Sequence, residues 1–99
     1  MIRGGREMNI NAGDYITLKS LKEVMQLYDE SELIMFGCGE SLIAGNTYFS
    51  PEMVVALETS EVYRVEQVDG DDFAIIINGN SYWFEKNCIK DVYRLTKVS

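Results

Sequence analysis

The sequence predicts a mainly β fold of the α+β class, in which a helical segment interrupts five short strands. Three stretches, 61–68, 73–78 and 81–84, have the β-forming composition of strands and follow one another closely. Asp-Gly and Gly-Asn pairs separate them, and both pairs are typical of hairpin turns. A serine capping pattern earlier in the chain predicts helix, so the helical part precedes most of the strands.

The N-terminal part predicts one strand followed by one helix. Residues 11–14 are turn-like and lead into the β-forming stretch Tyr15–Leu18. Ser20 and Glu23 then match a capping box, in which the serine hydroxyl accepts a backbone N–H and the glutamate reaches back. Apolar residues follow at helical spacing, which predicts a helix of about three turns over 20–30.

The spacing of apolar residues is less regular between residues 29 and 48. This predicts a long surface loop that contains at most one short extra strand. Ser50, Pro51 and Glu52 then mark a helix start, with a capping hydroxyl, a first-turn proline and an acidic residue. This second helix is expected to run through Leu57 and to cover one end of a sheet.

Residues 85–90 predict a short turn, with room for one turn of 3₁₀ helix, before a last strand over 91–98. Five strands, three of them joined by tight turns, with a helical turn before the last, are the layout of a five-stranded SH3-like barrel. The segment of about 20–57 is then a helical insertion between strands 1 and 2. Such a barrel closes its sheet and leaves little exposed edge.

Four motifs carry a resemblance to a known family: Gly13–Leu21, Tyr48–Met53, Val62–Val65 and Tyr82–Phe84. Through them the chain resembles small phage- and prophage-encoded proteins with SH3-like or Mind-bomb-type barrels, mostly of unassigned function, over most of residues 13–93. The resemblance implies a fold and a phage context but no active site. One position departs from the family, which usually has a glycine just before the strand that starts near Val62.

Size and charge limit what the chain can bind. A chain of 99 residues can bury one modest core, so residues 8–99 are expected to form a single domain. Sixteen acidic against nine basic residues give a net charge of −7, which opposes binding to nucleic acid or to an anionic membrane. A partner protein with a basic surface is favoured instead. The competing interpretation is that the acidity serves solubility alone.

The amino terminus suggests a translated leader. Residues 3–8 read Arg-Gly-Gly-Arg-Glu-Met, which purine-rich codons resembling a ribosome-binding site can encode. We therefore expect Met8 to be the initiator and residues 1–7 to be leader. The alternative is a flexible basic arm.

No constellation in the sequence predicts catalysis, a metal or a cofactor. The chain has no histidine, which removes the usual general base, and its two cysteines, Cys38 and Cys88, lack zinc-site spacing. We expect two ordinary, semi-buried, reduced thiols. Residues 1–10 lack the apolar core of a signal peptide and no apolar run could span a bilayer, so the expected location is the bacterial cytoplasm.

Two groups of side chains are candidates for binding. Tyr82, Trp83 and Phe84 cannot all point inward on one strand, so either Trp83 or its two neighbours face outward, unless helix 20–30 covers them. The second group consists of acidic residues in expected connections: Asp29, Glu30, Glu32, Asp69, Asp71 and Asp72. The last three could also hold Ca²⁺, although the twelve-residue calcium-loop pattern is missing.

These observations predict a non-enzymatic phage or mobile-element accessory protein that binds and inhibits a host protein, in the manner of an anti-defence (anti-CRISPR-like) inhibitor. Its acidic residues would occupy the nucleic-acid channel of a host nuclease. Two alternatives stay open: a barrel that binds a small molecule or nucleotide, and a structural protein that self-associates into a homo-oligomer.

Overall fold

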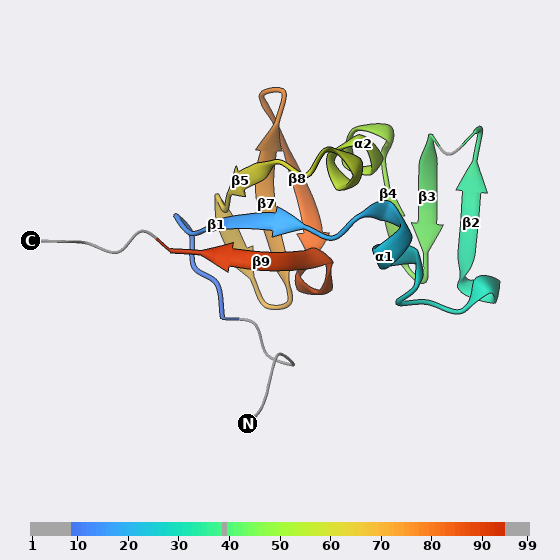
Figure 1. Cartoon of the computed structure of the whole chain (residues 1–99), viewed down its shortest axis with the longest axis horizontal. Coiled ribbons are helices and arrows are strands. Elements are labelled where there is room, and N and C mark those ends of the chain that lie inside the picture. The colour runs from blue at the N-terminus through green and yellow to red at the C-terminus, as the bar shows by residue number, and fades with distance from the viewer. Residues whose placement is uncertain (1–8, 39, 95–99) are drawn as a thin grey trace, which may run out of the picture.

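The computed structural model describes residues 9–38 and 40–94, and their fold is mainly β with short helices, as predicted. The strands form three small three-stranded sheets (Figure 1). The predicted leader, residues 1–7, and the end of the predicted last strand lie outside the described residues.

The first sheet has the strand order β5-β1-β9, with β1 at Tyr15–Leu18, β5 at Val62–Arg64 and β9 at Ile89–Tyr93. The predicted first strand is confirmed, and the last strand starts at Ile89, two residues earlier than predicted. Ile16 and Leu18 alternate inward along β1 and are buried, which explains why this stretch forms a half-buried strand.

The second sheet is an antiparallel meander of β6 (Gln67–Asp69), β7 (Asp72–Ile77) and β8 (Asn80–Glu85). Gly70 has a φ of 60°, as the first central position of a type II′ hairpin turn requires. Asn78 and Gly79 both have positive φ, so the β7–β8 turn lies one residue before its predicted place at Gly79-Asn80. An Asn-Gly pair suits this type I′ geometry.

A bend divides the long strand that was predicted over 61–68. Val65 is fully buried, and its carbonyl accepts a hydrogen bond from Gly13 N–H at 2.8 Å. The next residue, Glu66, instead donates to the Ala74 carbonyl of β7 at 2.8 Å. The part before the bend belongs to the sheet β5-β1-β9 and the part after it to the sheet β6-β7-β8. The described strands form no closed barrel, so the predicted closed five-stranded barrel is not confirmed.

The predicted helix over 20–30 is too long. Ser20 and Glu23 form the expected capping box, but α1 covers only Leu21–Met25. The chain then turns, and Asp29 starts the short 3₁₀ helix η1 (Glu30–Glu32), whose own Glu32 bonds back to Asp29 N–H. Leu27 is 44% exposed, so the apolar spacing did not reflect a continuous buried face.

The predicted surface excursion contains a complete sheet. β2 (Leu33–Phe36), β3 (Ser41–Ala44) and β4 (Thr47–Phe49) pair in the order β2-β3-β4, and we call them the insertion sheet. The prediction of one short extra strand was therefore wrong. β2 is apolar at every position, so it lacks the alternation that reveals a strand.

The second predicted helix is confirmed as α2 (Pro51–Thr59), with Ser50 accepting a hydrogen bond from Met53 N–H. In Figure 1, α1 and α2 lie between the insertion sheet and the other two sheets. A second 3₁₀ helix, η2 (Lys86–Cys88), precedes β9 at the predicted place.

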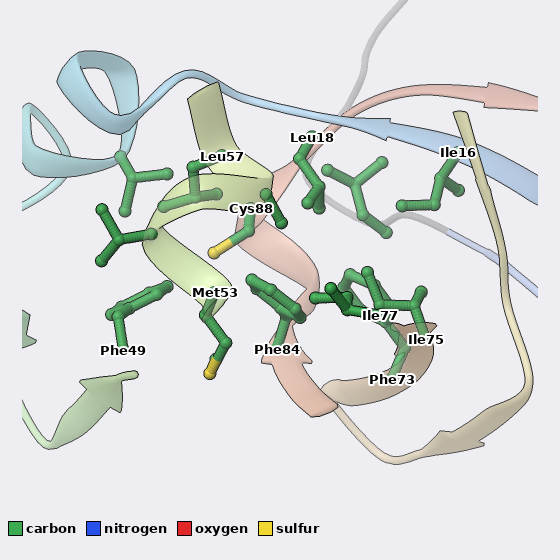
Figure 2. Close-up of a cluster of buried hydrophobic side chains, with 14 of the residues drawn as sticks. Ile16, Leu18, Phe49, Met53, Leu57, Phe73, Ile75, Ile77, Phe84 and Cys88 are labelled. Atoms are coloured by element: carbon green, nitrogen blue, oxygen red, sulfur yellow. The ribbon is translucent and has the colours of Figure 1, made fainter. Parts of the chain in front are cut away.

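A buried cluster of side chains connects the insertion with the other sheets. Phe84 of β8 stacks on Phe73 with ring centroids 5.9 Å apart, and it meets Phe49 of β4 edge-on at 6.2 Å. Figure 2 shows Phe84 between Met53 and the group that contains Phe73 and Ile77. Aromatic pairs of this geometry add to the free energy of area burial.

Candidate protein-binding surface

The outer face of β6-β7-β8 presents an exposed tryptophan. Along β8, Phe84 points inward and is 1% exposed, Tyr82 is half-buried, and Trp83 points outward with 42% of its surface exposed. The sequence left open whether Trp83 or its two neighbours face outward, and in the structure it is Trp83. The alternative that helix 20–30 covers the outward side chain is wrong, because Trp83 stays 42% exposed. The inward Phe84 packs against Phe49 and Phe73.

A row of three carboxylates crosses this face. The strand register places Asp69 opposite Asp72, and Asp72 opposite Glu85, so all three side chains stand on the same face of neighbouring strands. Like charges directly opposite each other destabilise a sheet. Thr47 Oγ1 of β4 donates a hydrogen bond to Glu85 Oε2 at 2.7 Å, which fixes one end of the row.

Trp83 lies in the neighbouring row of the same face. The register aligns Gln67, Ala74 and Trp83 across the three strands. Ala74 is fully buried although it points outward, since larger side chains flank it on both sides. Trp83 therefore lies on the sheet beside the carboxylates. The sequence could not place it there, because the register depends on the two turns.

The structure divides the six predicted acidic residues into two groups. The second group lies at η1, where Asp29, Glu30 and Glu32 are all exposed. The Glu32 carbonyl accepts a hydrogen bond from Gly45 N–H at 2.9 Å, which joins η1 to the β3–β4 turn. Thr47, on the other side of that turn, bonds to Glu85. These contacts connect η1 to the end of the carboxylate row.

The pKa of Tyr28 depends on carboxylates from both η1 and the carboxylate row. Burial raises the pKa of the Tyr28 phenol, a hydrogen bond with the Asn87 side chain lowers it, and the charges of Glu85 and Glu32 raise it. One carboxylate from each region therefore acts on a single phenol. The structure brings the two acidic groups to neighbouring parts of the surface. Asp71 lies in the β6–β7 turn beside the carboxylate row, and its carbonyl accepts a hydrogen bond from Lys86 N–H.

Little positive charge offsets this acidity. The three ion pairs among residues 9–38 and 40–94 use Asp14, Glu23 and Glu66, and none uses the six predicted carboxylates. The stretch from 23 to 63 has no lysine or arginine but eight acidic residues: Glu23, Asp29, Glu30, Glu32, Glu40, Glu52, Glu58 and Glu61. A cationic partner would therefore meet little competition from the chain itself.

A cavity of about 510 Å³, which sequence reasoning missed, opens between α1, η1 and α2. Leu21, Met25 and Leu33 provide apolar lining, while Lys22, Glu30 and Glu58 are among its polar residues. Its lining residues lie between Leu21 and Leu33, except for Glu58 of α2. The sequence could not reveal the cavity, because it forms only where α2 packs against α1. The balance of charge suits a polyanion poorly.

The two cysteines differ from the predicted pair of semi-buried thiols, since Cys38 is exposed and Cys88 is buried. Burial raises the pKa of the Cys88 thiol to about 12, with a further contribution from Glu85. No group of three or more His, Cys, Asp or Glu side chains in the described part of the chain is placed to hold a metal, so Asp69, Asp71 and Asp72 gain no support as a Ca²⁺ site.

Within residues 9–38 and 40–94, the helices are all too short or too polar to cross a membrane. Comparison with protein-family models, with curated proteins and with solved structures found no match to this chain. The chemistry of the surface itself therefore has to indicate the function.

Proposed function

We propose that this chain is a non-enzymatic protein-binding module whose partner presents a basic surface. The observation that carries the proposal is the placement of the exposed Trp83 beside the carboxylate row of Asp69, Asp72 and Glu85. An accessible indole on a sheet, next to carboxylates that form no ion pair among the described residues, suits a lysine or arginine side chain.

The two parts of this surface have different roles in binding. Tryptophan is among the residues that most often dominate interface energies, and its ring attracts a cation by about 0.5–2 kcal/mol. The carboxylates mainly accelerate and orient docking, because charge complementarity acts on encounter more than on final affinity. Trp83 should therefore control how long the complex lasts, and the carboxylates how fast it forms.

The finer hypothesis is that the chain is a phage or mobile-element inhibitor of a host protein, with its acidic surface in a nucleic-acid channel. The strand orders β5-β1-β9 and β6-β7-β8, with η2 before β9, support the SH3-like arrangement on which the phage resemblance depends. The exposed carboxylates of η1 and of the β6–β7 turn support the choice of a basic channel as target.

Affinity capture from a bacterial lysate tests the proposal with matched variants. Trp83→Ala should weaken retention of the partner, and Asp69→Asn/Asp72→Asn should lower retention and its sensitivity to salt. The control variant Glu52→Gln/Glu61→Gln removes the same charge from exposed positions on another part of the chain and should retain the partner. Association rates measured with the purified partner then separate the two roles.

Either of two results would overturn the proposal. Retention that does not change between about 0.1 and 1 M NaCl would show that charge is not used. Equal retention by Trp83→Ala and by the unmodified chain would remove the tryptophan from the interface.

The alternative of a small-molecule binder is supported by the cavity, whose volume falls within the usual range for ligand sites. A ligand there would need an apolar body and few negative charges. A thermal-shift screen that gives no stabilisation by any compound, together with an unchanged protein partner for Met25→Trp, would dismiss this candidate.

A further inference from the structure

We propose that β2 is a docking edge for an extended, basic segment of a partner protein, which adds to the insertion sheet as a further strand. β2 pairs with β3 on one side, and among the described residues no strand pairs with its other side. In Figure 1 it is the outermost strand, at the end of the molecule away from β5, β1 and β9. This edge is distinct from the Trp83 surface.

Large apolar side chains of β2 are exposed on both faces of the insertion sheet. Ile34 and Phe36 are 52% and 43% exposed on one face, where Tyr48 of β4 extends the apolar patch. Met35, on the opposite face, is 42% exposed. Three consecutive exposed apolar residues on an edge strand are expected to be covered by another chain.

The backbone of β2 has hydrogen-bonding groups available for such a strand. Ala44 and Thr47 flank a two-residue turn and therefore bond to each other, so the N–H and C=O of Ala44 face β4 rather than β2. Leu33 is paired with Ala44, so this pair is not hydrogen-bonded, and the same holds two residues along for Met35. The backbone N–H and C=O groups of Leu33 and Met35 therefore point to the free edge of β2. Leu33 N–H already donates to the Glu30 carbonyl, which leaves Met35 as the central free donor.

The edge also lacks the features by which proteins block strand addition. Those features are lysine, proline, an inward charge or a bulge. β2 has the sequence Leu-Ile-Met-Phe and a continuous register with β3.

Charge decides which occupant fits. Glu30 and Glu32 precede β2, Glu40 follows it, and no lysine or arginine occurs between residues 23 and 63. A second copy paired antiparallel through β2 would bring these carboxylates against one another. A strand that alternates apolar with basic side chains would cover Ile34 and Phe36 and neutralise the flanking acids. The choice of a basic protein as partner rests on the proposed function.

A defined probe tests this docking mode without knowledge of the natural partner. We would titrate the isotope-labelled chain with a peptide of about ten alternating lysine and valine residues. The expected result is a change in the backbone NMR signals of β2 and a fall of about tenfold in the exchange rate of the Met35 amide proton. Peptides with glutamate in place of lysine, or with a central proline, should not bind.

Variants then locate the site. Met35→Pro removes the outward N–H without removing a bond to β3 and should abolish binding, as should Ile34→Ser/Phe36→Ser. Trp83→Ala should leave the peptide-induced changes in the β2 signals and the protection of the Met35 amide unchanged, and unchanged β3 and β4 signals show that the insertion sheet stays folded. Loss of binding in Trp83→Ala alone would support the proposed function and overturn this inference.

Two further results would overturn the docking edge. Binding of the proline-containing peptide as tightly as the alternating one would show that no strand is added. A dimer of the free chain that Met35→Pro dissociates in sedimentation would assign the edge to a second copy.

Discussion

Cys88 shows how burial alone sets the chemistry of a single residue. The sequence offered two equivalent cysteines, but the structure places Cys88 inside the core beside Glu85 and leaves Cys38 in an exposed turn. Thiols react as thiolates, so burial makes Cys88 inert at neutral pH. Only Cys38 should react with a thiol reagent in the native state.

The raised pKa of Cys88 predicts a pH-dependent stability. The folded thiol keeps its proton up to a pKa of about 12, whereas the unfolded thiol loses it near its ordinary pKa of 9.0. Between these values the unfolded chain binds fewer protons, so stability falls as pH rises, by about 1.4 kcal/mol per pH unit. Urea unfolding at several pH values would measure the slope.

Cys88→Ala should flatten this slope, and Cys38→Ser is the matched control that should leave it unchanged. A slope that persists in Cys88→Ala would assign the effect to other groups, such as Tyr28, whose pKa is also raised.

At the scale of elements, α2 ends on a serine in a conformation that glycine prefers. Ser60 has a φ of 58° at the helix C-cap. The sequence has Thr59, Ser60 and Glu61 before the following strand, with no glycine among them. The backbone geometry that favours glycine at Ser60 became visible only in the structure.

Ser60→Gly should therefore stabilise the chain. Relief of the left-handed strain is worth about 1–2 kcal/mol, and the greater freedom of glycine in the unfolded chain offsets about half, leaving a gain of about 0.5–1 kcal/mol. Thermal and urea unfolding would measure it. Ser60→Ala retains the strain and should give no gain, so equal stabilisation by both variants would contradict this explanation.

The three sheets differ in how well the local sequence predicts them. Both hairpins were predictable from their Asp-Gly and Gly-Asn pairs, because turn chemistry is local, although the second turn lies one residue before its predicted place. The insertion sheet was not, since β2 is uniformly apolar and its register depends on β3 and β4. The bend at Val65 was equally hidden, because it arises from contacts with the distant residues 13, 14 and 74.

At the scale of the whole molecule, Phe49 connects the insertion with the rest of the core. Its ring meets Phe84 of β8, and the side chain is 1% exposed. Phe49→Ala should lower the free energy of unfolding by about 3–5 kcal/mol, through lost burial and an unfilled cavity. Trp83 is the sole tryptophan, so its fluorescence reports the β6-β7-β8 sheet during unfolding.

The neighbouring Tyr48→Ala is the matched control, because Tyr48 points to the outer face and is 54% exposed. It should change stability by less than about 0.5 kcal/mol. An equal effect of the two variants would show that the Phe49–Phe84 contact does not join the two parts.

The sequence by itself determined the net charge, the mainly β class, the two helix starts and the presence of the tight turns. Net charge follows from composition alone, and capping and turn chemistry depend on residues close together in the chain. Only the tertiary structure decided that Trp83 faces outward beside Asp72, that Cys88 is buried, and that β2 is an edge strand among residues 9–38 and 40–94. Each of these depends on strand register and on packing between distant segments. A local pattern does not encode that information, because a shift of one residue exchanges the faces of a strand.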